Sequence, residues 1–312
     1  MKISVDGGGL GAKKGERYGN YVFSENLIKA LTRFDKSNHY VIYTLDKLKP
    51  RFAWSKIRLS LEELKEKKDV FLALNQAVPL YVSGKIVTFC HGFSYYFFPK
   101  NYSLRDNIRL RNQLDEMIFK SDTIIVSSLK VKKELESIAI KYSKKNKVKV
   151  IPFGIPFDMA PHTLHVKRNT LKDYFLYVGM DHPIKNIELL KKAFGEIKKL
   201  EKFKRYKLIM ATENVARSKL IRLYQGASAL LTASYYESFN LPVLEALSQG
   251  TPVIGLESAI IPEFKPYVQT AHNLKGFINQ MKNIRPLNLQ IVNKLRKEFN
   301  WKNYVEKLVK LY

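Results

Sequence analysis

The sequence predicts an α/β protein with two doubly wound, Rossmann-like domains, and two observations lead to this prediction. Short runs of β-branched and apolar residues alternate with helix-length amphipathic segments, which is typical of parallel sheets built from βαβ units. The alternation lapses once and then restarts, and 312 residues exceed the length of one typical domain. We therefore expect a first domain over residues 1–160, a second over residues 161–298 and a cleft between them.

Ten apolar runs predict the strands in order. The first domain is expected to contain KISVD, YVIYTL, DVFLAL, KIVTFC, DTIIVSS and KVKVIPFG, and the second YFLYVG, YKLIMA, ASALLTAS and TPVIGL. The periodicity lapses between these groups, in FGIPFDMAPHTLHVKRNTLKD. Ligands of open α/β sheets bind beyond the carboxyl ends of strands. The loops that follow Asp6, Cys90, Val178 and Ser234 are therefore the candidate sites.

The formal net charge of +26 indicates an anionic partner: nucleic acid, an acidic membrane surface or a phosphorylated ligand. The alternative is that the lysine side chains are solvated on the surface and bind no partner. No apolar run approaches the ~20 residues that cross a bilayer, and the N-terminus lacks a signal-peptide core, so we expect a cytoplasmic chain. The single cysteine, Cys90, lies in KIVTFC and is expected to be a buried thiol.

The loop after the first strand reads GGGLGAKKGERYGN. Its glycines let backbone N–H groups approach a phosphate, and Arg17 and two lysines supply counter-charge. Gly7, Gly9 and Ala12 match a G-x-G-x-x-A dinucleotide pattern, but KKGERYG separates this match from the next helix, which disfavours a dinucleotide oxidoreductase. A basic surface loop without a ligand is the alternative.

The loop after the fourth strand, CHGFSYYFFPKNY, places His91 just past a strand end. A histidine there can donate or accept a proton near neutral pH, although a lone histidine is often structural. The aromatic residues Tyr95, Tyr96 and Phe97 are interpreted either as core or as a platform for an acceptor with apolar surface.

The second domain opens with YFLYVGMDHPIKNIELLKKAF, in which Gly179 ends a strand and Lys185 stands at the head of a helix. The helix dipole and free N–H groups favour an anion at this position, and the lysine can neutralise a diphosphate. A lysine whose charge is solvated is the alternative.

The stretch YYESFNLPVLEALSQG holds Glu237 and Glu245. Pro242 suits the first turn of a helix and Asn240 its cap, which places Glu237 on the loop and Glu245 one turn into the helix. Both glutamates can then reach one ligand, where one carboxylate stabilises positive charge on a sugar carbon and the other binds hydroxyls. The alternative is that Glu237 is solvated on the loop and that Glu245 only interacts favourably with the helix dipole.

These segments together resemble family 4, or group 1, glycosyltransferases, which are retaining enzymes with the GT-B fold. ASYYESFNLPVLEALSQGTPVIG is similar to the E-x7-E segment of that family, YVGMDHPIKNIELL to its donor-phosphate segment and VTFCHGF to its histidine-bearing strand end. RYGNYVFSENLIKAL resembles its first helix. FNWKNYVEKLVKLY, within residues 299–312, resembles its closing helix, which returns to the N-terminal domain. The resemblance implies two domains that face across a cleft.

The resemblance also implies roles for individual residues. Glu237 corresponds to the glutamate near the donor sugar, Glu245 to the one that binds the nucleotide ribose, and Lys185 to the lysine on the diphosphate. His91 corresponds to the histidine beside the donor sugar and acceptor. We expect Glu237, His91 and Lys185 to be catalytic. The expected donor-binding residues are Gly9, Gly11, Arg17, Gly179, Lys185, Asn240, Leu241 and Glu245. No metal or cofactor is expected besides a UDP- or GDP-sugar substrate.

The sequence departs from the family pattern at four places. Met180 stands where many members have an arginine, so Arg17 or another cation is expected to take over its role. Asn240 replaces a glycine, and Gly92 an aspartate. Only TENVARSK remains where the family has a further helix and strand that help to hold the base, so the second domain is shortened.

The resulting hypothesis is a retaining glycosyltransferase that moves a sugar from a nucleotide-sugar to a lipid-linked or surface-glycan acceptor. The charge favours a peripheral position on the inner face of the membrane. Two alternatives stay open: transfer to modified DNA, and a GT-B binding scaffold without turnover. The sugar, the base, the acceptor and the oligomeric state do not follow from the sequence.

Overall fold

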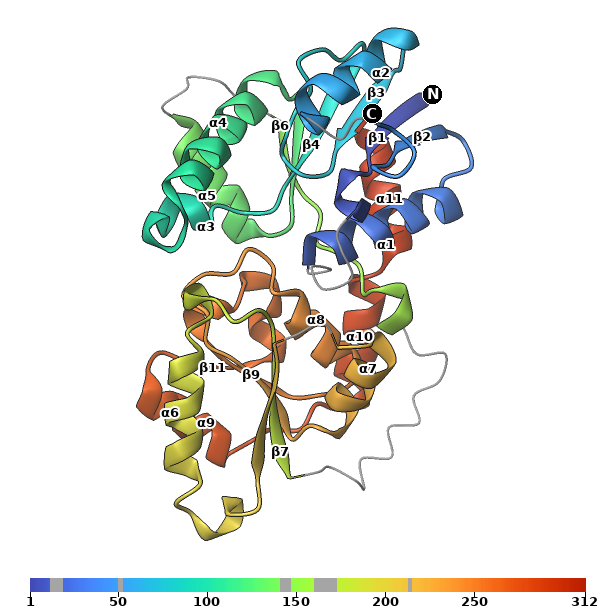
Figure 1. Ribbon diagram of the computed structural model, residues 1–312. Coiled ribbons are helices and arrows are strands. Elements are labelled where there is room, and N and C mark those ends of the chain that lie inside the picture. Colours follow the sequence, from blue (N-terminus) through green and yellow to red (C-terminus); the bar gives the residue numbers. More distant parts are fainter. Residues whose placement is uncertain (12–18, 50–52, 141–146, 160–172, 213–214) are drawn as a thin grey trace. The chain divides into compact units, whose positions relative to one another are not determined.

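The computed structural model describes residues 1–11, 19–49, 53–140, 147–159, 173–212 and 215–312 (Figure 1). Contacts divide the chain into two compact units. The first unit comprises Met1–Gly154 together with Trp301–Tyr312, and the second comprises Ile155–Asn300. The first unit thus ends a few residues before the predicted boundary at 160, and it takes in the helix at the end of the sequence.

The first unit contains a parallel six-stranded sheet with the order β2-β1-β3-β4-β5-β6. Its strands coincide with the six predicted runs: β1 Lys2–Asp6, β2 His39–Tyr43, β3 Val70–Ala73, β4 Lys85–Cys90, β5 Thr123–Val126 and β6 Lys147–Val150. The central strands β3 and β5 are buried throughout, as expected for a sheet with helices on both faces.

Helices and short turns of the first unit pack with these strands or connect them. They are η1 Gly8–Gly11, α1 Gly19–Phe34, η3 Trp54–Arg58, α2 Leu59–Lys65, α3 Ser94–Phe97, η4 Pro99–Asn101, α4 Leu104–Lys120, α5 Leu129–Ala139, α11 Trp301–Leu308 and η12 Val309–Leu311. Serine side chains cap two of the helices, because Ser103 accepts the N–H of Asp106 and Ser128 that of Val131.

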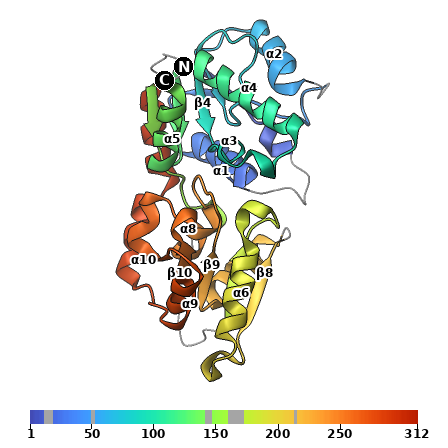
Figure 2. The same cartoon turned by 90° about the vertical axis from the view of Figure 1, so that its left-hand side faces the viewer.

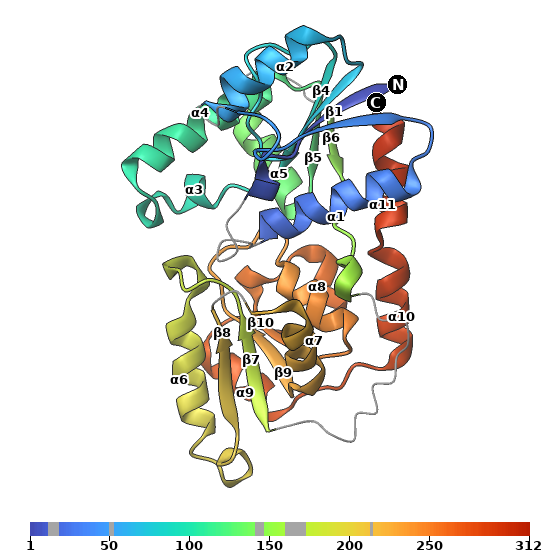
Figure 3. The same cartoon turned by 45° about the vertical axis from the view of Figure 1, so that its right-hand side comes forward.

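The closing helix α11 packs along α1 within the first unit (Figure 3). The ring of Phe23 lies 6.1 Å from that of Trp301 and 6.3 Å from that of Tyr304. Trp301 also covers Gly154, where an added Cβ would come within 2.6 Å of the indole. The aromatic side chains of α11 therefore complete the core beside α1.

The second unit contains a parallel five-stranded sheet with the order β11-β10-β9-β7-β8. The strands are β7 Tyr174–Val178, β8 Lys207–Ala211, β9 Ala229–Thr232, β10 Val253–Leu256 and β11 Gln269–Ala271. Strand β8 lies at the edge of this sheet, and only residues 212–216 separate it from the next helix. The structure therefore confirms the predicted fold class of two parallel-sheet α/β domains.

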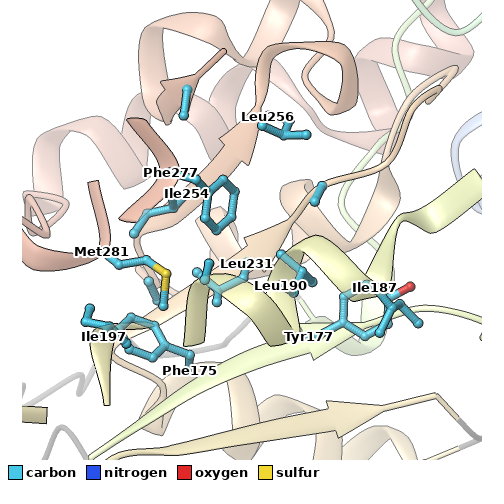
Figure 4. Close-up of a cluster of buried hydrophobic side chains, with 14 of the residues drawn as sticks. Phe175, Tyr177, Ile187, Leu190, Ile197, Leu231, Ile254, Leu256, Phe277 and Met281 are labelled. Carbon is cyan, nitrogen blue, oxygen red and sulfur yellow. The ribbon is translucent and has the colours of Figure 1, made fainter. Parts of the chain in front are cut away.

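Helices of the second unit cover both faces of its sheet. They are α6 Ile187–Ile197, α7 Arg217–Gly226, α8 Leu241–Ser248, α9 Leu274–Lys282 and α10 Leu289–Glu298, with the short turns η6 Phe157–Met159, η8 Pro183–Lys185, η9 Glu201–Phe203, η10 Glu257–Ala259 and η11 Pro262–Tyr267. Phe175, Leu190, Leu231 and Phe277 belong to the core between the sheet and the helices α6 and α9 (Figure 4). On the opposite face, α10 packs against α8 (Figure 2).

Candidate active site

Two loops meet at the carboxyl ends of the neighbouring strands β7 and β9. The N–H of Tyr235, in the loop after β9, donates to the carbonyl of Ile184 at 2.8 Å, in the turn after β7. The Nδ1 atom of His182 accepts the N–H of Ile184 and so caps that turn. These bonds fix the two segments that the sequence analysis assigned to phosphate and sugar.

The contact between the loops brings Lys185 and Glu237 together, although they are 52 positions apart. Lys185 Nζ lies 2.7 Å from Glu237 Oε1, and Ser234 Oγ donates to the same oxygen at 2.7 Å. The two charged side chains are 20% and 12% exposed. The ion pair is therefore held in place, but it remains reachable from solvent at the edge of the sheet.

Gly179 ends β7 with a positive φ of +154°, and an added Cβ would come within 2.8 Å of the Tyr177 hydroxyl. That hydroxyl donates to the carbonyl of Met180 at 3.0 Å. Glycine is thus required for the chain to turn away from the strand. The exposed side chain of Met180 occupies the place where the family resemblance implies an arginine.

Asn240 corrects one expectation about this site. It precedes α8, but its side chain does not cap the helix: Nδ2 donates to Thr232 Oγ1 at 3.2 Å and to the carbonyl of Ala259 at 3.0 Å. Its φ of 67° lies in the left-handed region, which glycine adopts freely and asparagine tolerates. This conformation explains why asparagine can stand where the resemblance implies glycine. Leu241 is the first residue of the helix and supplies its first N–H group, whereas Pro242, the second residue, has no N–H group.

Glu245 has a different set of partners from Glu237. It is 3% exposed, and it accepts a hydrogen bond from Tyr224 Oη at 2.9 Å on Oε2. Its other oxygen lies 2.8 Å from Arg217 Nη2, and Arg217 also binds Asp158 through two nitrogen atoms, at 2.7 and 3.0 Å. Burial raises the pKa of the Glu245 carboxyl, while Arg217 and Tyr224 act in the opposite direction. The glutamate is thus enclosed by an internal polar network.

Sequence reasoning missed Arg217 and Asp158. Arg217 begins α7 and belongs to the shortened segment TENVARSK, and Asp158 lies in the turn η6. Nothing in their spacing relative to Glu245 indicates a contact, because three separate segments meet only in the folded unit. The one available signal was an arginine at the start of a helix that follows a strand end.

The glycine loop of the first unit forms the turn η1 around Asp6. The buried Asp6 carboxylate accepts the N–H of Gly8 at 2.9 Å and the indole N–H of Trp54 at 2.8 Å. Added Cβ atoms would come within 3.1 Å of Ser24 at Gly9 and within 2.4 Å of Leu45 at Gly11. The loop is therefore packed tightly against its own unit. Arg17, the predicted cation of this loop, lies outside the described residues.

His91 lies at the end of β4 and is held by its neighbours. Its Nε2 atom lies 2.6 Å from the carbonyl of Leu74, and the ring packs edge-on against Phe23 at 4.9 Å. Although part of the ring reaches solvent, burial lowers its pKa to about 4. The imidazole is therefore neutral at pH 7 with the proton on Nε2, since a carbonyl can only accept. A neutral imidazole of this kind is disfavoured for proton exchange near neutrality and has Nδ1 as an acceptor, and the catalytic role expected of His91 stays a prediction.

Residues around His91 also have clear structural reasons. Gly92 has a positive φ of 103°, which favours glycine over the aspartate that the resemblance implies. Phe93 and Tyr95 belong to the core, whereas Phe97 is 44% exposed, so the aromatic run is divided between the two interpretations. Cys90 is buried and its pKa is raised to about 12 by burial, as expected of an unreactive thiol.

Two features are absent from the described part of the chain. No group of three or more His, Cys, Asp or Glu side chains is arranged to hold a metal ion there. None of the described helices combines the length and apolar character needed to span a bilayer.

Comparison with known proteins identifies the segment that surrounds the two glutamates. Residues 207–265, from β8 to the turn η11, match the family model of glycosyl transferases group 1. The resemblance to group 1 glycosyltransferases is thereby confirmed. The matched group 1 segment includes Arg217, Glu237, Asn240 and Glu245.

Individual proteins resemble the chain in part of its sequence or in its fold. The chain is 32% identical over 115 residues to the O-antigen chain mannosyltransferase B of Escherichia coli, an alignment that covers 29% of this chain and 30% of that relative. Sucrose-phosphate synthase from Thermosynechococcus elongatus has a similar structure, with a TM-score of 0.71 and 16% identity over 100% of this chain and 98% of the other. A lipopolysaccharide outer core galactosyltransferase in its apo form has a TM-score of 0.60 and 14% identity over 99% of both chains. The fold is GT-B.

Proposed function

We propose that this chain is a retaining glycosyltransferase that moves a sugar from a UDP- or GDP-sugar to a lipid-linked or surface-glycan acceptor at a membrane. The ion pair of Lys185 and Glu237 carries this proposal. It joins the donor-phosphate segment and the E-x7-E segment at the ends of two neighbouring strands, which is where open α/β sheets bind ligands.

The pair suits the charges that develop when a sugar leaves a diphosphate. Negative charge grows on the diphosphate, and the Lys185 ammonium together with the Leu241 N–H at the start of α8 can stabilise it. Positive charge grows on the anomeric carbon, where the Glu237 carboxylate, already oriented by Ser234, can stabilise it. In this proposal protein groups stabilise both the negative and the positive charge, so a metal ion is not required.

His91, in the first unit, has a positioning role in this proposal. Because its imidazole is neutral and its Nε2 donates to Leu74, its Nδ1 can accept a hydrogen bond from a sugar hydroxyl. It would orient the acceptor or the donor sugar without taking up a full proton at pH 7.

The exposed face of α3 and α4 supports a lipid-bound acceptor. Leu104, Ile108 and Phe97 are 77%, 53% and 44% exposed. Exposed cations lie in the same stretch of the chain: Lys100, Arg105, Arg109, which pairs with Asp106, and Arg111. We call these seven residues the basic α4 face. Apolar side chains flanked by cations suit the boundary of an anionic membrane, whereas DNA phosphates require the cations alone.

The names of two similar proteins also support an acceptor of this kind. One is named for the O-antigen chain and the other for the lipopolysaccharide outer core. The alignment with the first spans only 30% of its length, so the acceptor class is inferred from the combination of this likeness with the basic α4 face.

Calorimetric titration tests the donor side of the proposal. We expect one of UDP, GDP and ADP to bind, and Lys185→Ala to weaken that binding by about tenfold or more, since it removes a charge-assisted contact. Lys191→Ala is the matched control, because Lys191 is an exposed lysine that pairs with Glu188 on α6. If no nucleotide binds at millimolar concentration, the scaffold hypothesis replaces the enzyme.

Product analysis tests the reaction. With the sugar conjugate of the nucleotide that binds, NMR of the product should show the anomeric configuration of the donor. The enzyme should retain its turnover after treatment with EDTA. An inverted product would exclude the retaining mechanism.

A further inference from the structure

We propose that Arg217 is a positioning residue of the donor site. Its guanidinium holds the Glu245 carboxylate in place, and that carboxylate accepts hydrogen bonds from the nucleotide ribose. This inference rests on the proposed function, because only the family resemblance assigns the ribose to Glu245. It adds a residue that the resemblance does not supply and that the shortened second domain makes available.

The position of Arg217 in the sheet supports this role. It begins α7, which follows β8, while Lys185 follows β7 and Glu237 follows β9. These strands are neighbours in the order β9-β7-β8 and run parallel, so all three residues lie beyond the same edge of the sheet. Arg217 thus comes from the third of three adjacent loops that form a site of this kind.

The contacts of Arg217 fix Glu245 without exhausting its capacity as an acceptor. Arg217 Nη2 and Tyr224 Oη approach different oxygens of Glu245, at 2.8 and 2.9 Å. An ionised carboxylate has about four acceptor positions, so further positions are left for the two hydroxyls of a ribose. Arg217 is 32% exposed whereas Glu245 is 3% exposed, so in this proposal the ribose hydroxyls approach the enclosed carboxylate past the guanidinium.

Asp158 holds Arg217 in turn. Two nitrogens of the guanidinium, Nε and Nη2, donate to the two carboxylate oxygens of Asp158, at 2.7 and 3.0 Å. This paired geometry is the most directional that arginine makes with a carboxylate. The guanidinium therefore cannot rotate freely, and it presents Nη2 to Glu245.

The electrostatic consequence concerns the ionisation of Glu245. Burial raises the pKa of this carboxyl, Arg217 and Tyr224 lower it, and Asp158 raises it further. Burial also raises the pKa of Tyr224 far above its ordinary value, so that its hydroxyl remains a donor. Without Arg217, Glu245 would take up a proton at a higher pH, and a protonated carboxyl offers fewer positions to a ribose.

Nucleotide binding by Arg217→Gln and Arg217→Lys tests the proposal. The ligands are the nucleoside diphosphate that the unmodified protein binds and its 2′-deoxy analogue, titrated between pH 5.5 and 8.5. We expect Arg217→Gln to weaken the ribonucleotide by about tenfold, corresponding to one charge-assisted hydrogen bond, and the deoxy analogue by clearly less. The loss should grow as the pH falls, and Arg217→Lys should recover part of the affinity.

Arg222→Gln is the matched control, since Arg222 is an exposed arginine on the same helix. Thermal unfolding of each variant reports whether the second unit remains folded. Carbon NMR of labelled Glu245 gives a readout without nucleotide, in which Arg217→Gln should raise the pKa of this carboxyl.

Two results would overturn the inference. One is unchanged ribonucleotide affinity in Arg217→Gln at every pH. The other is an equal, pH-independent loss for both nucleotides together with an unchanged Glu245 pKa, which would indicate a direct phosphate contact or a folding defect. If the unmodified protein binds no nucleotide, the proposed function fails and the ribose role fails with it, whatever the NMR titration shows.

Discussion

The charged residues of the site are paired with one another. Lys185 is paired with Glu237, and Arg217 with Glu245 and Asp158. A partly buried charge that loses its partner costs more than the pair contributes, so a substitution disturbs the remaining residue as well. Single substitutions in this site therefore require a binding measurement and a stability measurement together.

Glu237→Gln should separate chemistry from binding. Because the amide keeps the shape and still reaches Ser234, we expect the nucleotide affinity to change by less than about threefold while kcat falls by at least ~100-fold, as for loss of a group that acts in the transition state. Calorimetry and steady-state turnover measure the two effects. A parallel loss in both would indicate that Glu237 mainly holds Lys185.

His91 should make the folded protein less stable in mild acid. Its pKa is about 4 in the folded protein against 6.5 for an ordinary histidine, so the unfolded chain binds a proton that the folded protein does not. The stabilisation is complete above pH 6.5 and is lost as the pH falls towards 4, a difference of ~3 kcal/mol if only this group titrates.

Urea unfolding of the unmodified protein and His91→Gln, at several pH values between 4 and 7, measures this effect. The free energy of unfolding should fall more steeply with acid in the unmodified protein than in the variant. Parallel curves would show that His91 is protonated in the folded protein.

Asn240 should respond to substitution according to its backbone. Asn240→Gly loses two hydrogen bonds but relieves the left-handed conformation, whereas Asn240→Ala loses the bonds and keeps the strain. We therefore expect alanine to destabilise the second unit by ~1 kcal/mol more than glycine. Thermal unfolding of both variants measures the difference, and equal melting temperatures would contradict the explanation.

At the scale of elements, the sequence pattern located every described strand except β11 at the sheet edge, but it could not orient side chains on the loops between them. The run ASALLTAS predicts β9, and Gly179 correctly marks the end of β7, because apolar runs and glycines are local signals. The contact of Arg217 with Glu245 and the bonds of Asn240 depend on tertiary packing between distant segments. Such contacts leave no mark in a single sequence.

The basic α4 face yields a prediction about this element. Leu104→Ser with Ile108→Ser should release the protein from vesicles that contain phosphatidylglycerol, because two exposed apolar side chains no longer enter the lipid boundary. Co-sedimentation measures binding, and Leu289→Ser, at a residue that is 58% exposed on α10, is the control. Binding to duplex DNA at the same salt, unaffected by the double change, would favour the DNA hypothesis instead.

At the scale of the whole molecule, the alternation of strands and helices was sufficient to predict two α/β domains, but the division of the chain between them also depends on a distant helix. Residues 301–312 belong to the first unit, although 146 residues of the second unit separate them from Gly154. The resemblance implied this return, whereas the amphipathic pattern of α11 alone indicates only that one face is buried.

Removing α11 should therefore destabilise the first unit selectively. Trp301, Tyr304, Val305 and Leu308 are buried, and the loss of even one large aromatic side chain costs ~3–5 kcal/mol. A chain that ends at Asn300 keeps one tryptophan, Trp54 of the first unit, so its fluorescence reports that unit directly. The full-length Trp301→Phe variant is the control, and identical Trp54 transitions in the two proteins would refute the role of α11.

The return of α11 also has a consequence for biosynthesis. A ribosome makes residues 1–154 first, but the helix that covers Phe23 is made only after the whole second unit. The nascent first unit must therefore wait for about 150 residues, or roughly eight to thirty seconds at usual elongation rates, with part of its aromatic core open to water. During that interval the second unit can fold ahead of the first, in the reverse of the order in which they are synthesised. We expect a chaperone to bind the growing chain at the aromatic side chains that α11 has not yet covered.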